Sequence, residues 1–457
     1  MPLPSASLDL PESPPPRPAL SAVLLAAAGA VQAVGDGRSL TDALAGVPPA
    51  LRPAAQAVSF HAMRQWGWAG AIAGSLVQRS PGALFDALLQ VSLSLLRVPP
   101  GEDGAADGLP ALPGMPVYAP HTVVNQAVTA AAGQRGLSAY KGLLNASLRR
   151  FLRERAALEG AVADRPEVRW NHPGWWVDQL RAAYPDQWQA IAAAANVPAP
   201  LILRVNPRRA TREQVRQALQ DAGIAAEPVG AAGLVLAQAR PVTQLPGFAE
   251  GWWSVQDAAA QLAAPLLGPR DGQRVLDACA APGGKTAHLL ELADLDLLAL
   301  DADATRLQRV GQNLDRLGLR SDRVALAAAD AADLDAWWDG RPFDAVLADV
   351  PCTASGIVRR HPDIRWLRRA PDIARTAALQ GRIVDALWRT VAPGGRLLYV
   401  TCSVFPAEGE RQAEAFARRH ADARRLDAPG QLLPVAIGAT PQAQHDGFFY
   451  ALFAKQS

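Results

Sequence analysis

The sequence predicts an α/β domain with a doubly wound, mostly parallel sheet in the C-terminal half of the chain. An all-α region and a small α+β unit are expected to precede it. Three observations carry this prediction: Ala and Leu recur at helical spacing up to about residue 160, two apolar runs flank a polar helix within residues 201–238, and from about residue 272 apolar strands alternate with helices. Such alternation is typical of parallel sheets that are covered by helices on both faces.

Length and composition exclude several classes of protein. The chain has 457 residues, 49% hydrophobic and 19% charged, which suggests roughly two to four domains and excludes a largely disordered chain. The formal net charge of +2 excludes a globally basic nucleic-acid-binding protein but allows local basic patches. Three cysteines without a Cys-x-x-Cys pair argue against a disulfide framework or a zinc site, and they favour a reducing, cytoplasmic location. No apolar run is long enough to cross a membrane.

The N-terminal part is expected to be helical. Residues 1–18 are rich in Pro and Ser and predict a disordered tail. Residues 19–160 predict an all-α domain, in which residues 99–120 form a long loop dense in Pro and Gly, and residues 140–155 form the clearest helix. The apolar face of that helix is predicted to consist of Leu144, Leu148, Phe151 and Leu152.

Residues 161–250 predict linker helices followed by a small α+β subdomain. Four tryptophans within residues 161–200 favour short packed helices. Thr211 is a plausible N-cap for a helix after the first strand. The elements expected in this unit are strands over residues 201–205 and 233–238 and a helix over residues 211–222.

Residues 251–457 predict the doubly wound domain. Within residues 305–317, leucines and a valine recur on one helix face, and Gly318 ends the helix. Ligands of such sheets bind at the carboxyl ends of the strands, so every loop that follows a strand is a candidate site. The predicted strands cover residues 274–278, 295–300, 324–328, 343–348, 396–401 and 447–453.

The first such loop, residues 277–286 (DACAAPGGKT), carries two glycines directly before a helix. Gly283 and Gly284 allow a ligand to approach the backbone, and the helix start offers free N–H groups. The loop matches neither GxxxxGK[ST] nor GxGxxG, and a tight turn without a ligand is the alternative. Asp301 follows the second strand, where an acid binds ribose hydroxyls in nucleoside-binding sheets. Asp330 follows the third strand, within reach of an adenine edge.

Two cysteines follow neighbouring strands. Cys352 ends the run DVPC, which begins at Asp349, and Cys402 lies in TCS. We expect both thiols to face one cleft, because the fourth and fifth strands are adjacent in this topology. A lone cysteine is most often a small buried apolar residue, but two at adjacent strand ends favour a chemical role. Cys279, in the first loop, is expected to line the ligand site by packing.

Together, DACAAPGGKT, DVPC and TCS resemble the RNA cytosine-C5 methyltransferases, which imply a class I methyltransferase fold with a seven-stranded sheet and the cofactor S-adenosylmethionine. Residues 355–368 (SGIVRRHPDIRWLR) and 255–261 (VQDAAAQ) narrow the resemblance to the RsmB/Fmu/Sun type, bacterial enzymes that modify 16S ribosomal RNA. Such enzymes carry an N-terminal domain like the antitermination factor NusB, and residues 141–155 are similar to its last helix. The resemblance covers nearly the whole chain after the tail.

The resemblance also implies roles. Cys402 would be the nucleophile that adds to carbon 6 of cytosine, Cys352 would assist product release, and Asp349 would hydrogen-bond the flipped base. Lys285 would lower a thiol pKa or hold a phosphate, with an ordinary surface lysine as the alternative. DNA enzymes use the Pro-Cys cysteine as nucleophile, so spacing alone does not decide between the thiols. The implied cofactor contacts are Cys279, Ala280, Ala281, Pro282, Gly283, Gly284, Lys285, Asp301, Asp330 and Asp349.

Two further features bear on the function. The usual DxPCSGxG run reads DVPCTASG here, with Thr353 and Ala354 in place of Ser and Gly, which predicts a stiffer loop. Arginines cluster in the small α+β unit, after the catalytic loop and on the helical domain. Together with a tryptophan near the catalytic loop they predict an RNA-facing strip, with solvated helix faces as the alternative. The predicted RNA contacts are Arg204, Arg208, Arg359, Arg360, His361 and Trp366.

The sequence therefore predicts a methyltransferase of small-subunit rRNA. A tRNA cytosine-C5 methyltransferase and a non-catalytic, RNA-binding ribosome-assembly factor are the alternatives. The two thiols and the cofactor loop argue against the binding-only alternative, because a pure binder needs neither. No metal and no membrane partner is expected, and a monomer is the default.

Overall fold

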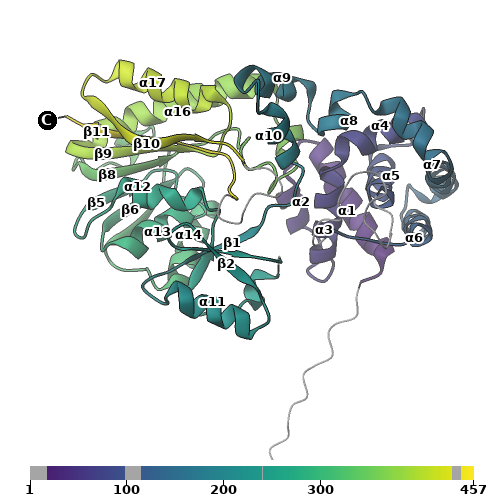
Figure 1. Cartoon of the computed structure of the whole chain (residues 1–457), viewed down its shortest axis with the longest axis horizontal. Helices are drawn as coiled ribbons and strands as arrows, with labels where there is room; N and C mark the ends of the chain where they lie inside the picture. Colours follow the sequence, from purple (N-terminus) through teal and green to yellow (C-terminus); the bar gives the residue numbers. More distant parts are fainter. Residues whose placement is uncertain (1–17, 98–114, 239, 435–443, 457) are drawn as a thin grey trace, which may run out of the picture.

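The computed structural model describes residues 18–97, 115–238, 240–434 and 444–456. A helical part lies at one end of the molecule and the α/β domain at the other, with a small sheet beside them (Figure 1). The predicted tail before residue 18 and most of the predicted loop at residues 99–120 lie outside the described residues.

The helical part is a bundle in which α1 packs against α3, α5 and α6. The predicted last helix is present but extends to Val162, and Leu144, Leu148 and Phe151 are buried on its inner face. Leu152 is 39% exposed, so its assignment to the buried face was wrong. It follows Phe151 in the chain and therefore points away from the face that Leu144, Leu148 and Phe151 share. The helices are α1 (Leu20–Gly35), α2 (Leu40–Ala45), α3 (Arg52–Met63), α4 (Trp66–Leu76), α5 (Ala83–Leu96), α6 (Pro120–Gly133) and α7 (Lys141–Val162).

Three short helices and a four-stranded sheet follow. The sheet has the order β2-β3-β1-β4, all antiparallel, and Thr211 caps α11 through a capping box with Gln214. The prediction missed β2 and β4. Because β4 pairs with β1, the small sheet reaches residue 255, past the expected boundary at residue 250. The elements are α8 (Pro166–Trp170), α9 (Gly174–Ala183), α10 (Trp188–Ala194), β1 (Leu201–Val205), α11 (Arg212–Asp221), β2 (Ala226–Val229), β3 (Gly233–Leu236) and β4 (Trp253–Val255).

The α/β domain contains a seven-stranded sheet of order β10-β11-β9-β8-β5-β6-β7. The strands from β9 to β7 are parallel, while β11 pairs antiparallel with both of its neighbours, β9 and β10. All six predicted strands are present within a few residues, but β10 was missed. The strands are β5 (Arg274–Asp277), β6 (Asp296–Asp301), β7 (Val324–Ala328), β8 (Phe343–Asp349), β9 (Val391–Thr401), β10 (Ala423–Leu432) and β11 (Phe448–Lys455).

Helices cover both faces of this sheet, as expected for a doubly wound class I methyltransferase fold. Alternate strand residues divide between two cores: Val275 packs with α12, α13 and α14, and Leu276 packs with α16 and α17. Gly318 ends α14 with a left-handed φ of 67°. The helices are α12 (Ala263–Leu267), α13 (Gly284–Leu292), α14 (Ala304–Leu317), α15 (Ile364–Leu367), α16 (Ala370–Thr390) and α17 (Glu410–Arg419). Short 3₁₀ turns are η1 (Ser138–Tyr140), η2 (Val242–Gln244), η3 (Ala260–Leu262), η4 (Leu334–Ala336) and η5 (Pro406–Glu408).

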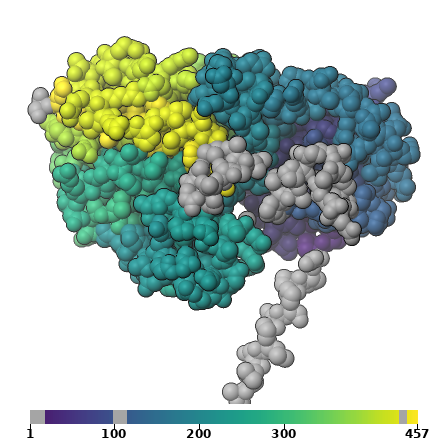
Figure 2. Space-filling view, viewed as in Figure 1, coloured from purple at the N-terminus to yellow at the C-terminus, as the bar shows by residue number. Residues whose placement is uncertain are grey.

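Helices α8 to α10 connect the bundle with the α/β domain. In the space-filling view they lie between the bundle and the C-terminal part of the chain (Figure 2). Trp176 of α9 is buried against Phe405, with their ring centroids 5.1 Å apart. Among the described helices, none is long and apolar enough to span a membrane.

Candidate active site

The two cysteines of DVPC and TCS meet at the carboxyl ends of adjacent parallel strands. Asp349, the last residue of β8, pairs with Val400 of β9, so the loops that follow leave the sheet side by side. The sulfur atoms of Cys352 and Cys402 are 3.4 Å apart, and both side chains are partly exposed. Two thiols at this distance can act on the same atom or on neighbouring atoms of one substrate.

Lys285 and Asp349 form an ion pair beside these thiols. The Lys285 ammonium donates to Asp349 Oδ2 at 2.6 Å, and the two side chains are 13% and 27% exposed. Burial disfavours the cation, but the charge and hydrogen bond of Asp349, with smaller contributions from the charges of Cys402 and Asp277, outweigh burial and raise the pKa of Lys285. Lys285 is therefore a stable cation within electrostatic reach of Cys402, not an ordinary surface lysine.

The predicted ligand loop, residues 278–283, follows β5 and depends on glycine at its end. Gly283 is the N-cap of α13 with a φ of 97°, and a Cβ there would lie 3.1 Å from Val310 of α14, so both conformation and space require glycine. Below the loop, Asp277 is fully buried and accepts a hydrogen bond from Thr286. Burial raises the pKa of Asp277 to about 7, and its Oδ1 atom has no protein partner.

Acidic groups surround this loop and suit a cationic ligand. Burial raises the pKa of the Cys279 thiol, and so do the nearby charges of Asp349, Asp277 and Asp301. A cluster of carboxylates at a strand-end loop complements the positively charged sulfonium cofactor that the resemblance implies. Asp301 accepts the backbone N–H of Ala281 at 3.0 Å, which joins the end of β6 to the loop, whereas Asp330 is exposed after β7. The predicted contacts Ala280 and Pro282 lie in the same loop.

The loop after Cys352 contains Ala354 where the usual motif has glycine. Ala354 adopts a left-handed φ of 58°, a conformation that favours glycine and costs an alanine about 1 kcal/mol. The turn directs the Ala354 N–H to the Cys352 sulfur at 3.4 Å. Ala354 therefore adopts this turn at some cost in backbone energy, and the stiffer loop stays a prediction.

The prediction that Arg204 faces RNA is wrong. Its side chain is fully buried and forms a bidentate ion pair with Glu291 of α13, at 2.7 and 2.8 Å. It also donates to the Gly284 carbonyl at 2.7 Å and to Gln256. Arg204 thus ties β1 of the small sheet to the helix that follows the ligand loop.

Arg359 and Arg360 are also mainly structural. Both pair with the fully buried carboxylate of Asp446, and Arg360 donates to Asp257 at 2.9 Å. Arg359 is 5% exposed and the Arg360 side chain is 23% exposed. The prediction of an RNA contact is therefore wrong for Arg359, because its guanidinium is enclosed, and Arg360 has little surface left for RNA.

The segment after these arginines docks the helical bundle. Trp366 packs against the bundle core, and Asp363 accepts the Leu40 N–H at the start of α2, at 2.9 Å. Arg64 of the bundle donates to the Arg359 carbonyl at 2.9 Å. Burial lowers the pKa of His361, which leaves a neutral ring. The predicted RNA strip is thus largely an interface between domains, which corrects the assignment of Trp366 to RNA.

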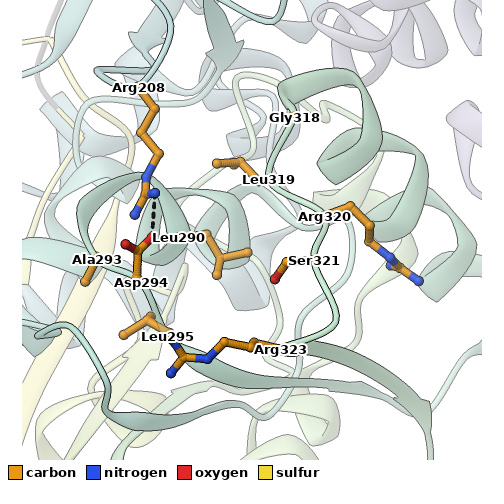
Figure 3. A pocket seen from close by; sticks show the side chains of 10 residues that line it. All are labelled: Arg208, Leu290, Ala293, Asp294, Leu295, Gly318, Leu319, Arg320, Ser321 and Arg323. Carbon is orange, nitrogen blue, oxygen red and sulfur yellow. Dashed lines mark hydrogen bonds and ion pairs between the residues drawn. The ribbon is translucent and has the colours of Figure 1, made fainter.

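Arg208 remains partly exposed, in a depression on another side of the domain (Figure 3). It pairs with Asp294 at 2.6 Å, and Arg320 and Arg323 line the same cavity of about 270 Å³. Most of the lining residues directly precede β6 and β7, so the cavity lies at the amino ends of these strands. The cysteines follow the carboxyl ends of β8 and β9, on the opposite side of the sheet.

Replacing Arg204 tests its structural assignment. We expect Arg204→Met to destabilise the protein by about 3–5 kcal/mol, because it leaves Glu291 as an unpaired buried charge. Arg208→Ala is the matched control, since an exposed pair contributes about 0–1 kcal/mol. Thermal unfolding followed by circular dichroism measures both. Equal melting temperatures for the two variants would contradict the assignment.

One buried carboxylate in the site was missed. Glu408, in the turn after the TCS motif, is fully buried and bonds to residues next to both cysteines. Its only sequence signal is its position six residues after Cys402, which does not distinguish it from a surface glutamate. Within the described ranges, no group of three or more His, Cys, Asp or Glu side chains is placed to hold a metal ion.

Comparison with known families places the two C-terminal units. Residues 264–454 match the family described as 16S rRNA methyltransferase RsmB/F, and residues 172–243 match its ferredoxin-like domain. The solved structure of a methyltransferase homologue from Pyrococcus horikoshii is 28% identical and covers 63% of this chain and 97% of its own, with a TM-score of 0.54. The PH0851 structure, 23% identical, covers 95% of this chain and 99% of its own with a TM-score of 0.74, which supports the whole fold.

Two curated relatives of this chain carry the same name. A ribosomal RNA small subunit methyltransferase B from Vibrio cholerae is 40% identical over 95% of this chain and 98% of its own length. Another from Pseudomonas syringae pv. tomato is 49% identical over 69% of this chain and 72% of its own length. The similarity extends through both the helical bundle and the α/β domain. The chain is therefore an RNA methyltransferase and belongs to the RsmB/F family of 16S rRNA methyltransferases.

Proposed function

We propose that this RsmB/F methyltransferase transfers a methyl group from its cofactor, S-adenosylmethionine, to carbon 5 of a cytosine in 16S rRNA, through a covalent Cys402–cytosine adduct. The observation that carries the proposal is the pair of thiols 3.4 Å apart beside the Lys285–Asp349 ion pair. Carbon 5 of cytosine is too weak a nucleophile to accept a methyl group unaided. A thiolate that adds at carbon 6 turns the ring into an enamine-like nucleophile.

Cys402 is assigned as the nucleophile. The Lys285 ammonium lies within electrostatic reach of the Cys402 sulfur. When the Cys402 sulfur bonds to carbon 6, the π bond between carbons 5 and 6 breaks and its electron pair shifts toward carbon 4 and ring nitrogen 3. Asp349 accepts a hydrogen bond from the exocyclic amine, and Lys285 stabilises the displaced charge. Bound S-adenosylmethionine supplies an electrophilic methyl group, which carbon 5 accepts.

Cys352 is assigned to the second half of the reaction. The proton on carbon 5 must leave while the bond between Cys402 and carbon 6 breaks, which restores the aromatic ring. Cys352 is 3.4 Å from Cys402 and so lies within reach of the atom next to the one that Cys402 attacks. The two steps use different thiols, because Cys402 is occupied as a thioether when the proton leaves.

The ligand loop is assigned to the cofactor. Residues Cys279–Gly284 and Asp301 would hold it, with the start of α13 beneath. Three carboxylates near Cys279 favour a cationic group there. Asp330, which is exposed after β7, is assigned to the adenine edge.

For RNA, we propose a phosphate contact in the depression formed by Arg208, Arg320 and Arg323. Guanidinium groups bind phosphates through paired N–H donors. Arg360 and His361 contribute only where their partly exposed edges reach the substrate. An RNA that contacts this depression and the cysteines at once has to reach from the amino ends to the carboxyl ends of the parallel strands. This favours a long, structured RNA over a short single strand.

A methyl-transfer assay with three RNA pools tests the proposal. The purified protein and radiolabelled S-adenosylmethionine are incubated with unmodified small-subunit rRNA, large-subunit rRNA and tRNA. We expect label only in small-subunit rRNA, recovered as 5-methylcytosine after nuclease digestion. Label in tRNA would retain the chemistry but overturn the substrate. Label in no pool would point either to a partly assembled subunit as the substrate or to an RNA-binding assembly factor.

A further inference from the structure

We infer that Glu408 is a positioning residue that joins the two cysteine loops and sets the separation of their thiols. The inference rests on the proposed function, in which Cys402 and Cys352 act in sequence on one base. Glu408 belongs to η5, the turn that follows the TCS motif, and its side chain is 0% exposed.

Each oxygen of the Glu408 carboxylate accepts two hydrogen bonds of 2.8 Å or less, and Oε1 has a fifth, longer contact of 3.5 Å from the Gln380 amide. Oε1 accepts the Thr353 N–H at 2.8 Å and the Thr376 hydroxyl at 2.5 Å. Oε2 accepts the hydroxyls of Thr353 at 2.5 Å and Ser403 at 2.6 Å. Thr353 directly follows Cys352 and Ser403 directly follows Cys402, so one carboxylate is bonded to both loops at the residues next to the thiols.

The choice of glutamate follows from these donors. A fully buried carboxylate is costly unless its oxygens are well hydrogen-bonded. Among the described residues no salt bridge includes Glu408, so its four donors stabilise the charge instead. Only a group with two acceptor oxygens can accept all four donors. A glutamine offers one oxygen, and its amide would face hydroxyls that now donate.

The carboxylate also acts on the chemistry of Cys352. The hydrogen bond with Cys402 raises the pKa of the Cys352 thiol, as do burial, the charge of Cys402 and the charge of Glu408. Glu408 therefore helps to keep Cys352 protonated. One buried charge thus bonds both cysteine loops and disfavours the Cys352 thiolate.

Glu408→Gln tests the inference, with Glu410→Gln as the matched control, because Glu410 is a partly exposed carboxylate paired with Arg425. The first readout is alkylation of Cys352 and Cys402 by iodoacetamide across pH, measured by mass spectrometry, which requires neither RNA nor methyl transfer. We expect Glu408→Gln to shift the alkylation profile of Cys352 to lower pH and Glu410→Gln to leave it unchanged. A profile that matches wild type in both variants would overturn the inference.

The second readout is steady-state methyl transfer to small-subunit rRNA. We expect Glu408→Gln to lower kcat at least about tenfold, the effect of losing one hydrogen bond to a charged group, with KM for RNA changed little. A loss of melting temperature without a change in thiol reactivity or kcat would show that Glu408 is only structural. If Glu408→Gln does not fold, Ser403→Ala removes the bond between the carboxylate and the Cys402 loop and should also lower kcat. If wild type methylates no RNA, the proposed function fails while the alkylation result still decides the role of Glu408.

Discussion

Cys402→Ala is expected to lower methyl transfer at least about a thousandfold, the order of loss when a covalent nucleophile is removed. The substitution deletes the sulfur that would add to carbon 6, and no neighbouring group replaces it. Cys352 lies 3.4 Å away, but the charge of Glu408 and burial disfavour its thiolate after the hydrogen bond to Cys402 is lost. The assay is incorporation of radiolabel into small-subunit rRNA under single-turnover conditions.

Two controls separate lost chemistry from lost structure. Cofactor affinity, measured by calorimetry, should be retained in Cys402→Ala, because the ligand loop lies after β5 and not after β9. The melting temperature should also change little, since Cys402 is partly exposed and its removal opens no enclosed cavity. Turnover near that of wild type would refute the assignment of Cys402 as nucleophile.

Much of the fold could be predicted because its signals are local. Apolar strands, the helix-ending Gly318 and the glycines of the ligand loop each follow from adjacent residues. The missed strands are at sheet edges. β10 contains Pro429 and Gly430 and exposes Arg424, Arg425 and Asp427, so its sequence is indistinguishable from that of a loop. Similarly, β2 contains Pro228. Such strands are defined by their partners, which the local sequence does not reveal.

The site could be predicted where the motif residues themselves lie at strand ends. It could not be predicted where residues far away in the chain determine whether a side chain is buried. Arg204 and Arg359 have the composition of an RNA surface, but their carboxylate partners lie 87 residues away in each case. These pairings bury the guanidinium groups in the structure. Glu408 was missed for the same reason, because its burial depends on Thr353 and Thr376, which are 55 and 32 residues away.

Cys352→Ala is expected to stop the reaction after the adduct has formed. Turnover should fall about a hundredfold or more, the range for loss of a positioned general base. The adduct between Cys402 and the RNA should accumulate, because the nucleophile is intact while release is impaired. A denaturing gel with labelled RNA would show it as a slowly migrating band that resists heat and detergent.

The physical reason is a change in Cys352 that follows from the chemistry of Cys402. In the free protein, the hydrogen bond with Cys402 raises the pKa of Cys352, together with burial and the charge of Cys402. Once the Cys402 sulfur is bonded to carbon 6 as a thioether, it carries no charge. Two of the causes that raise the pKa then weaken, so Cys352 becomes easier to deprotonate at the stage when a base is needed.

This sequence of events makes the trapped band specific. The double variant Cys352→Ala/Cys402→Ala should give no band, because without the Cys402 sulfur no adduct forms. Raising the pH should increase release in wild type, where Cys352 loses its proton more readily, but should not restore release in Cys352→Ala. A variant that turns over normally, or that forms no band while Cys402 is intact, would assign release to another group. Such a group would have to reach carbon 5 of the cytosine beside two thiols that are only 3.4 Å apart.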